Sequence, residues 1–226
     1  MKKLFLSSSF CDVAKYLTDF CGEELKGKTV TFIPTASLVE EYAGYVENDK
    51  NAFIELGIFV DVLNIEQKTE KEIAQILSQN DFIYVSGGNT FYLLQELKKS
   101  KADKLISEQI KNGKMYIGAS AGSVILSKNI EYIEQVDDKT KAAELKNYSG
   151  LGLIDFYPLP HYGNEPFAEH IENIYKEYHN KIPLIPISNS QVIEFKNNEK
   201  TNKRVNKIKI TAHNKVLPKA RLNGFE

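Results

Sequence analysis

The sequence contains no tryptophan, only two cysteines and only two arginines among its 226 residues. Cys11 and Cys21 lie ten residues apart and match neither a zinc site nor a disulfide framework, so we expect two thiols in a reducing compartment. Arg204 and Arg221 both lie near the C-terminus, and lysine carries the positive charge of the rest of the chain. This matters for substrate choice, because arginine is the side chain suited to bidentate capture of a carboxylate.

Long hydrophobic runs are also missing. The N-terminal segment is basic and then only briefly apolar, which is too short for a signal peptide, and no stretch approaches the length of a membrane span. The 29 basic and 30 acidic residues give a formal net charge of −1, so the chain has no global electrostatic footprint for nucleic acid or an anionic membrane. We expect a soluble, cytoplasmic protein that binds neither.

The sequence has enough apolar residues for a large core. Hydrophobic residues make up 42% of the chain, including 12 phenylalanines and 12 tyrosines, which excludes a disordered protein. Area scaling predicts that about 70% of the unfolded chain's surface is buried on folding, without help from disulfides or metals. The length favours one domain over residues 1–226.

Short apolar runs alternate with helical patterns along the first half of the chain. Strands are predicted over 4–7, 29–34, 59–65, 81–86 and 114–118, and helices over 13–25, 38–56, 73–77, 91–99 and 102–111. Alternation at this spacing is typical of βαβ units. We therefore predict an α/β fold with three layers, a doubly wound, mostly parallel sheet carrying helices on both faces.

The pattern is looser in the second half. Strands are predicted over 153–157, 184–187, 192–195 and 205–211, a helical start over 123–126 and a helix over 166–178. The polar stretch 196–203 indicates an exposed hairpin loop, and the last dozen residues a frayed tail. Contact between nucleic acid and the basic residues of that tail (Lys215, Lys219 and Arg221) is the minor alternative.

Residues 118–122 read Gly-Ala-Ser-Ala-Gly and fit the G-x-S-x-G pattern of a nucleophile elbow, with a predicted strand before them and a helical start after them. A tight strand-to-helix turn strains the backbone of the serine and leaves no room for bulky neighbours. It lifts the Ser120 hydroxyl above the carboxyl edge of the sheet, where open α/β sheets bind ligands. The alternative is a small-residue turn that only allows close packing, but the context favours Ser120 as a nucleophile.

A second glycine turn, Ser86–Thr90, follows the other deeply buried strand and reads Ser-Gly-Gly-Asn-Thr. Its backbone N–H groups are suited to complete an oxyanion hole with the N–H of Ala121. The polar side chains of Asn89 and Thr90 are candidates for contact with a ligand. A phosphate-binding turn and an ordinary structural turn remain alternatives, although the lysine of a P-loop is missing.

A serine nucleophile needs a base, and histidine is the usual one. His161 is the best of four candidates because it follows a predicted strand and is flanked by Pro160 and Gly163 in a loop at the sheet edge. His170 and His179 lie on a predicted helix, and their spacing with His161 matches no metal site, so we expect no metal.

The residue that orients His161 is ambiguous from sequence. Asn189 follows the predicted strand over 184–187, and Asp137, Asp138 and Asp155 are its acidic rivals. For Asp137 and Asp138 the favoured interpretation is a solvated turn.

Three separated motifs resemble, in order and spacing, those of peptidase family S51, the family of aspartyl dipeptidase (dipeptidase E) and cyanophycinase. They are the Gly-Gly-Asn-Thr of 87–90, the Gly-Ala-Ser-Ala-Gly-Ser of 118–123 and the Pro-His-Tyr of 160–162. The resemblance spans roughly residues 1–195, leaving 196–226 as a strand or hairpin and a C-terminal tail, and the chain's length favours the dipeptidase branch.

The resemblance implies a fold like that of class I glutamine amidotransferases. It also implies Ser120 as nucleophile, His161 as base and an oxyanion hole formed by the backbone of Gly88 and Ala121. The implied chemistry needs no metal or organic cofactor.

The chain departs from the family at two places. The family's dipeptidase has a glutamate in the segment matching 187–191, whereas this chain has Asn189 there. In that family an aspartate after the nucleophile elbow has also been held to matter, and Asp137 is its nearest match in this chain. An asparagine carbonyl can accept an imidazole N–H, as it does in cysteine–histidine–asparagine enzymes. Aspartyl dipeptidases carry arginines after the histidine, but 164–170 contains none. His170 is the only basic side chain of this segment and is a candidate for contact with the substrate. We therefore expect a neutral or different N-terminal residue to be preferred over aspartate.

These observations predict a serine exopeptidase that hydrolyses dipeptides or similarly small peptide amides, as a monomer or homodimer. The alternatives are an esterase or amidase acting on non-peptide substrates, and a binding protein on the same scaffold whose triad has decayed at Asn189.

Overall fold

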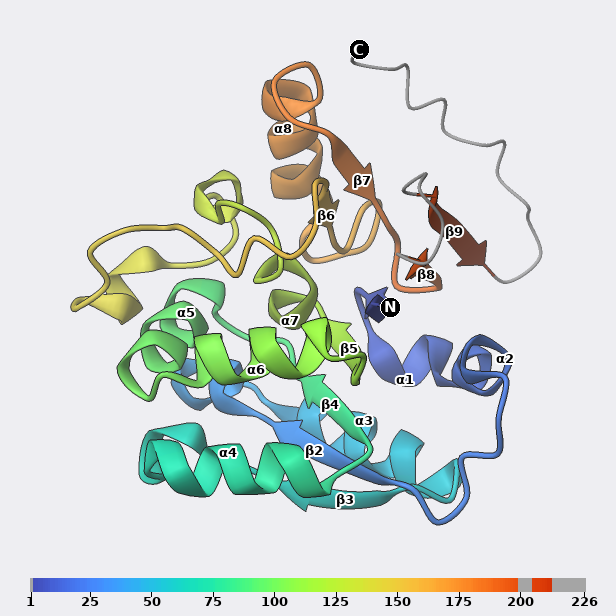
Figure 1. Cartoon of the computed structure of the whole chain (residues 1–226). Helices are drawn as coiled ribbons and strands as arrows, with labels where there is room; N and C mark the ends of the chain where they lie inside the picture. The colour runs from blue at the N-terminus through green and yellow to red at the C-terminus, as the bar shows by residue number, and fades with distance from the viewer. Residues whose placement is uncertain (1, 199–204, 213–226) are drawn as a thin grey trace.

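The computed structural model describes residues 2–198 and 205–212 (Figure 1). The prediction of a hairpin loop over 196–203 was wrong for residues 196–198, which belong to a strand that ends at Asn198. The rest of that loop and the whole predicted basic tail lie outside the described residues. Both arginines and His213 lie outside them as well.

A seven-stranded sheet forms the centre of the molecule, in the order β3-β2-β4-β5-β1-β8-β9. Its strands are β1 (Lys2–Ser7), β2 (Thr29–Ile33), β3 (Phe59–Val62), β4 (Phe82–Val85), β5 (Met115–Ala119), β8 (Gln191–Asn198) and β9 (Val205–Ala212). The first five in this order are parallel, whereas β8 runs antiparallel to β1, and β9 antiparallel to β8. The sheet is therefore mixed and mostly parallel, as predicted.

A second sheet has two parallel strands, β6 (Tyr157–Leu159) and β7 (Leu184–Pro186), joined through α8 (Ala168–Tyr178). In Figure 1 this unit lies on the side of the molecule away from β3 and α4 (Glu70–Gln79). His161 lies two residues after the end of β6, and Asn189 three residues after the end of β7. Two residues predicted to act together therefore come from the ends of two paired strands.

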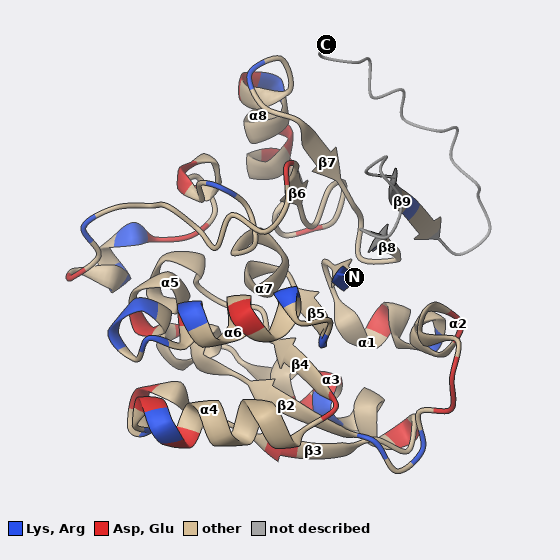
Figure 2. Ribbon diagram, in the orientation of Figure 1, with Lys and Arg blue, Asp and Glu red and all other residues tan. Residues whose placement is uncertain are grey.

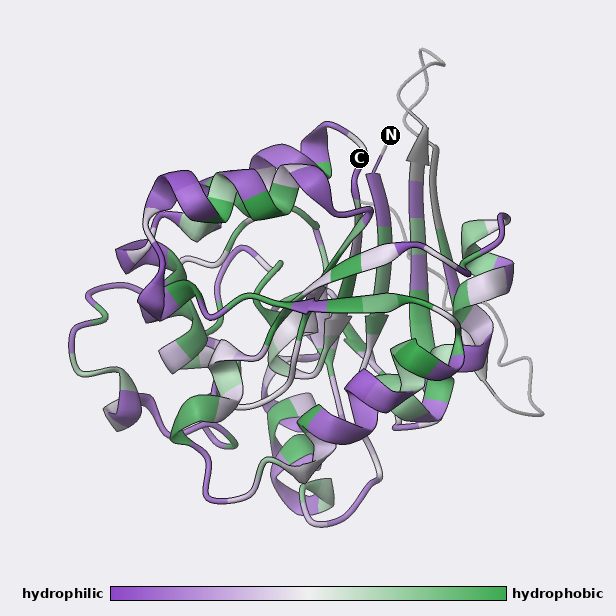
Figure 3. Cartoon of the chain, turned by 90° about the horizontal axis from the view of Figure 1, so that it is seen from below, coloured by the Kyte–Doolittle hydropathy of each residue, from purple (hydrophilic) through white to green (hydrophobic). Residues whose placement is uncertain are grey.

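Helices cover both faces of the central sheet. One face packs under α1 (Phe10–Val13), α2 (Leu17–Cys21) and α3 (Gly44–Glu55), and the other under α4, α5 (Thr90–Lys99), α6 (Ala102–Lys111) and α7 (Ala121–Val124). The charged residues lie mainly on the outer faces of the helices and in the loops (Figure 2), whereas hydrophobic residues concentrate along the strands and the inward faces of the helices (Figure 3). Within the described part of the chain, no helix is long and apolar enough to cross a membrane.

The face under α1 and α3 is aromatic. The rings of Phe10 and Phe53 stack with centroids 4.2 Å apart, and Tyr84 packs against both. The Tyr84 hydroxyl donates a hydrogen bond to Asp49, which also accepts the Cys11 N–H at 2.9 Å. Burial raises the pKa of Asp49 to about 6, because the charged carboxylate is poorly solvated there.

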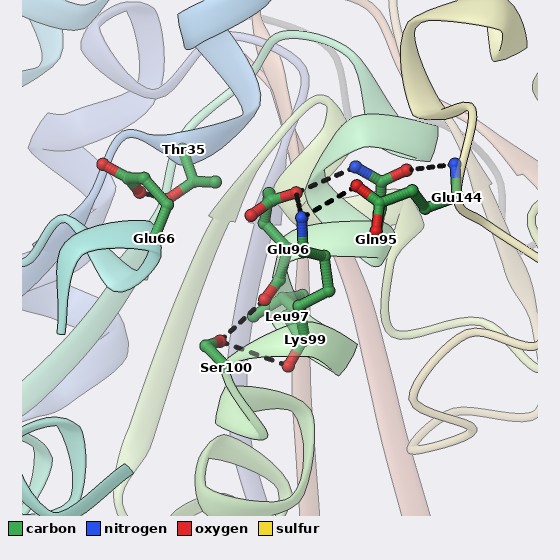
Figure 4. A network of polar contacts seen from close by, with 8 residues as sticks. All are labelled: Thr35, Glu66, Gln95, Glu96, Leu97, Lys99, Ser100 and Glu144. Carbon is green, nitrogen blue, oxygen red and sulfur yellow. Dashed lines mark hydrogen bonds and ion pairs between the residues drawn. The ribbon is translucent and has the colours of Figure 1, made fainter. Parts of the chain in front are cut away.

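The opposite face is largely aliphatic, and its helix α5 carries a polar network that includes two buried side chains, Gln95 and Glu96 (Figure 4). Gln95 donates to Glu96 at 2.8 Å and accepts the Glu144 N–H at 2.9 Å, while Lys99 forms ion pairs with both glutamates. Ser100 closes the helix by donating its hydroxyl to the Glu96 carbonyl at 2.7 Å. These contacts hold the chain around Glu144 against the helix.

Four predicted elements differ clearly from the structure. The strand expected over 59–65 ends at Val62, and a 3-10 turn over Ile65–Gln67 follows it. The helix expected over 13–25 is interrupted by a 3-10 turn over 14–16 and ends at Gly22, and the one expected over 38–56 begins only at Gly44. The strand expected over 153–157 is replaced by β6, which begins at Tyr157. The N–H groups of residues 151–153 instead donate to the carbonyls of 125–127, so this backbone is hydrogen-bonded to the end of α7 before a strand can begin.

Candidate active site

Ser120 lies in a sharp turn between β5 and α7. Its backbone angles are φ 46° and ψ −110°, a conformation that side chains rarely adopt, and its N–H donates to the Ser7 carbonyl at 2.9 Å. The turn has room only for small neighbours: a Cβ on Gly118 would lie 2.6 Å from the Gly122 oxygen, and a Cβ on Gly122 would lie 2.1 Å from the Val85 oxygen. The glycines of the motif are therefore required by close backbone approach.

The His161 imidazole faces this serine. Its Nε2 lies 3.0 Å from the Ser120 Oγ, which is hydrogen-bond distance. His161 also has a positive φ, 62°, and its ring packs against that of Phe167 with centroids 4.9 Å apart. The β6 strand end thus delivers the ring to the edge of the central sheet.

Asn189 completes a chain of three side chains. Its Oδ1 lies 2.8 Å from the His161 Nδ1, and its backbone N–H donates to the Asn164 Oδ1 at 2.9 Å. Because an amide oxygen only accepts, Nδ1 carries the imidazole proton in this arrangement. The lone pair of Nε2 is then left to accept the Ser120 hydroxyl proton.

The His161 environment favours the neutral imidazole. Burial lowers the pKa of His161, since the imidazolium loses solvation, and the hydrogen bond to Asn189 opposes part of this change. No carboxylate replaces the lost solvation, because the hydrogen-bond partner is an uncharged amide. The ring is therefore available as a base below the usual histidine pKa.

The loop after β4 lies against the elbow. The point where a Gly87 Cβ would stand is 3.2 Å from the Ser120 Cβ. Gly88 has φ 129°, and a Cβ there would lie 2.2 Å from the Ala36 oxygen, so only glycine fits. The N–H of Ala121 is one of the first donors of α7, which have no partner within the helix. The predicted oxyanion donors, Gly88 and Ala121, thus belong to two turns that meet at Ser120.

Asn89 and Thr90, predicted to contact a ligand, form hydrogen bonds within the protein. The Asn89 side chain caps α5 by accepting the Tyr92 N–H at 2.9 Å and donates to the Asp138 carbonyl at 3.0 Å. Both side chains are buried, and the Thr90 N–H donates to the Asp137 carboxylate at 2.8 Å. Their substrate contact remains a prediction, but the Asn89 amide is engaged within the protein at both ends.

The acidic rivals of Asn189 lie elsewhere. Asp137 accepts the Thr90 N–H, and burial raises its pKa to about 6. Asp138 accepts the Thr140 N–H at 2.9 Å, and the exposed Asp155 pairs with Lys128. The favoured interpretation of Asp137 as a solvated turn residue was wrong, because its carboxylate anchors the start of α5.

His170 lies on the third position of α8 with an exposed side chain, so its predicted contact with substrate remains a prediction. Two residues that sequence reasoning missed are Ser8, bonded to the His161 backbone, and Tyr45, whose ring lies 3.7 Å from the position that a Gly87 Cβ would occupy. A local sequence pattern could not identify either residue, because both contacts join segments that lie far apart in the sequence. Among the described residues, no three His, Cys, Asp or Glu side chains gather as a metal site.

Comparisons with known proteins agree on one family. The model of peptidase family S51 matches residues 4–203. The chain is 53% identical over 205 residues to an uncharacterized peptidase of Listeria monocytogenes, covering 91% of this chain and all of that protein. It is 27% identical over 175 residues to a peptidase E of a Nostoc species, covering 75% of this chain and 69% of that one.

The fold is shared as well. A crystal structure of a candidate peptidase E from Listeria monocytogenes superposes with a TM-score of 0.86 at 50% identity, covering 94% of this chain and 99% of that one. This match confirms the predicted fold, like that of class I glutamine amidotransferases.

Proposed function

Because the chain belongs to peptidase family S51 and is a peptidase, we propose that it acts as a serine-type exopeptidase on dipeptides or similarly small peptide amides. The observation that carries the proposal is the continuous chain of Ser120, His161 and Asn189, with contacts of 3.0 and 2.8 Å. A nucleophile, a base and a residue that orients the base in this order define the serine hydrolase arrangement on many folds.

The reaction begins when the Ser120 Oγ attacks the peptide carbonyl carbon and its proton passes to the His161 Nε2. The backbone N–H groups of Gly88 and Ala121 stabilise the oxyanion that forms. Collapse of this tetrahedral intermediate breaks the C–N bond, and Nε2 returns its proton to the leaving amine. A water molecule, activated by the same nitrogen, then hydrolyses the acyl-enzyme and regenerates the serine.

Asn189 orients the imidazole through its amide oxygen rather than through a charge. Its carbonyl holds Nδ1–H in place, but it stabilises the transient imidazolium less than a carboxylate would. Burial of His161 keeps the ring neutral and able to accept a proton at lower pH, but it also destabilises the imidazolium, because the charged ring loses solvation. The expected enzyme is active, with an imidazolium stabilised by hydrogen bonding alone.

The substrate's N-terminal residue is proposed to be neutral. Residues 164–170 follow the base and contain no arginine, and their one basic side chain, His170, is exposed on α8. Capture of an aspartate side chain by a bidentate guanidinium is therefore not available from this segment.

The test is hydrolysis of a mixed dipeptide library by the purified protein, read by mass spectrometry, with Ser120→Ala as the control. Cleavage that disappears in the variant supports a serine dipeptidase, and the peptides consumed identify the side-chain preference. A strong preference for Asp-X dipeptides would overturn the neutral-residue proposal. Labelling of Ser120 by a fluorophosphonate without peptide cleavage would favour an esterase or amidase, and the absence of labelling would favour a binding protein.

A further inference from the structure

Two consecutive serines at the end of β1 contact the two halves of the site. The Ser7 carbonyl accepts the Ser120 N–H at 2.9 Å and the Ser123 hydroxyl at 2.8 Å. The Ser7 hydroxyl donates to the Gly118 carbonyl at 3.0 Å. The first serine therefore fixes the nucleophile turn to β1 through its backbone and its side chain.

The next residue fixes the base. The Ser8 hydroxyl accepts the His161 N–H at 3.0 Å and donates to the Ile187 carbonyl at 2.9 Å. Ser8 is only 3% exposed, so water does not replace these bonds easily. The same Ile187 carbonyl accepts the Tyr162 N–H at 3.0 Å. One buried hydroxyl thus joins the end of β1 to His161, which follows β6, and to Ile187, which follows β7.

The conformation of His161 makes this contact necessary. Ile187 donates its N–H to the Leu159 carbonyl, and Tyr162 returns an N–H to Ile187, so both neighbours of the turn continue the pairing of the small sheet. With φ at 62°, the N–H of His161 points outside that pairing and needs another acceptor. Ser8 supplies it from the central sheet.

The catalytic groups belong to different sheets. Ser120 follows β5 of the seven-stranded sheet, whereas His161 and Asn189 follow the strands of the two-stranded sheet. The 3.0 Å distance between Nε2 and Oγ therefore depends on how the two sheets are held together. Ser7 and Ser8, adjacent in sequence, hold one partner each.

We propose that Ser8 is a positioning residue that holds His161 at hydrogen-bond distance from Ser120 by linking the two sheets. The inference rests on the proposed function, because it assigns Ser8 a role in serving the proposed base. The Ser8 hydroxyl bonds to the backbone of His161 and Ile187, so it acts on the imidazole through the backbone of His161. The hydroxyl, rather than the size of the side chain, carries the role.

The test compares Ser8→Ala with Ser8→Thr in the full chain. Misplacement of a catalytic group by about 1 Å costs on the order of 100-fold in rate, so kcat of Ser8→Ala is expected to fall about 10- to 100-fold, with KM within about twofold. Ser8→Thr keeps a hydroxyl and is expected to recover most of the loss. In the NMR spectrum of the ¹⁵N-histidine-labelled protein, the proton on the His161 Nδ1 is expected to broaden or exchange faster in Ser8→Ala than in wild type.

Ser100→Ala is the matched control, because it removes another hydroxyl bonded to a main-chain carbonyl, in the network of Figure 4 and away from the site. It is expected to lower thermal stability about as much as Ser8→Ala while leaving kcat unchanged. Equal kcat in wild type and Ser8→Ala, or equal losses in Ser8→Ala and Ser100→Ala, would overturn the role of Ser8. An inactive wild type that fluorophosphonate does not label would instead overturn the proposed function.

Discussion

The aromatic cluster under α1 and α3 differs from the carboxyl edge of the same sheet in how its residues are held. Phe10, Phe53 and Tyr84 touch one another directly and have ordinary backbone angles. At the edge, Ser120 and His161 have two of the three positive φ values found among the described non-glycine residues. Their backbone N–H groups donate hydrogen bonds to Ser7 and Ser8 at the end of β1.

The aromatic cluster is therefore expected to contribute mainly to the stability of the fold, and the sheet edge to its proposed function. Packed rings contribute free energy of folding wherever they lie, and their loss leaves a cavity. Strained residues cost about 1–3 kcal/mol each and persist only where the surrounding structure over-determines them. We therefore expect the strained residues at the sheet edge to lower the free energy of unfolding. The aromatic cluster is expected to raise it enough for the fold to tolerate that strain.

The largest expected effects come from one variant at the sheet edge and one in the aromatic cluster. Ser120→Gly removes the nucleophile and relieves its backbone strain, so we expect at least about a 10⁴-fold loss of peptidase activity and a gain of about 1 kcal/mol in the free energy of unfolding. Phe53→Ala is expected to lower that free energy by about 3–5 kcal/mol while the folded fraction keeps its activity. Urea titrations and activity assays on both variants check this; equal destabilisation by both would contradict the comparison.

A second prediction concerns the carboxyl group in the cluster. The folded pKa of Asp49 is raised to about 6, so its contribution to stability is fully present below about pH 4 and is lost as pH rises through 6. The loss is at most about 3 kcal/mol. Asp49→Asn is expected to flatten the decline in unfolding free energy between pH 4 and 6.5, measured by denaturant titration at each pH.

Asp137 has a pKa raised in the same direction and contributes a decline of its own, so Asp137→Asn serves as the comparison. If Asp49→Asn keeps the full wild-type slope, the buried carboxyl in the cluster is not its source.

The third prediction addresses the charge at Asn189. Asn189→Ala is expected to lower kcat about 10- to 100-fold, because the imidazole loses the acceptor that fixes its tautomer. Asn189→Asp places a carboxylate beside Nδ1 and raises the pKa of His161, so the acid limb of the rate–pH profile moves to higher pH by about 1 unit or more. If the acid limb of Asn189→Asp coincides with that of the wild type, a group other than His161 sets the acid limb.

The smallest effect is expected at Tyr45, in the first turn of α3. Its hydroxyl is buried and has no hydrogen-bond partner within the described residues, which costs free energy. Tyr45→Phe is expected to raise the free energy of unfolding by up to about 1 kcal/mol. Tyr42→Phe, whose side chain is 72% exposed, is the control and is expected to change nothing. Thermal denaturation of both variants is sufficient, and a loss of stability in Tyr45→Phe would show that its hydroxyl has a stabilising partner.

Sequence patterns predicted the elements whose partners are local or whose burial is complete. The helix at 102–111 was predicted with its observed bounds, and the buried strand β4 to within one residue at each end. The helix expected over 38–56 was too long because the Ala36 carbonyl accepts the Asn89 N–H at 2.8 Å, a contact that the local pattern does not contain. Tertiary contacts overrode periodicity there.

The site was predictable to the extent that each residue follows a strand. The elbow glycines and the strand before His161 indicated which side chains reach the sheet edge, but not which would meet. The choice of Asn189 over Asp137 depends on β6 pairing with β7, and Ser8 depends on β1 lying between β5 and β8. The pairings of β1 join residues more than a hundred positions apart, and no short pattern records them.

The position of β1 has a consequence for the order of synthesis. Its two neighbours are β5 and β8, so β1 cannot complete its pairing until Gln191–Asn198 has been translated. At about 5–20 residues per second, a ribosome adds the stretch from Ser120 to Asn189 in roughly 3.5 to 14 seconds. During that interval the nascent chain carries the proposed nucleophile without Asn189, so the proposed chain of Ser120, His161 and Asn189 can form only after it.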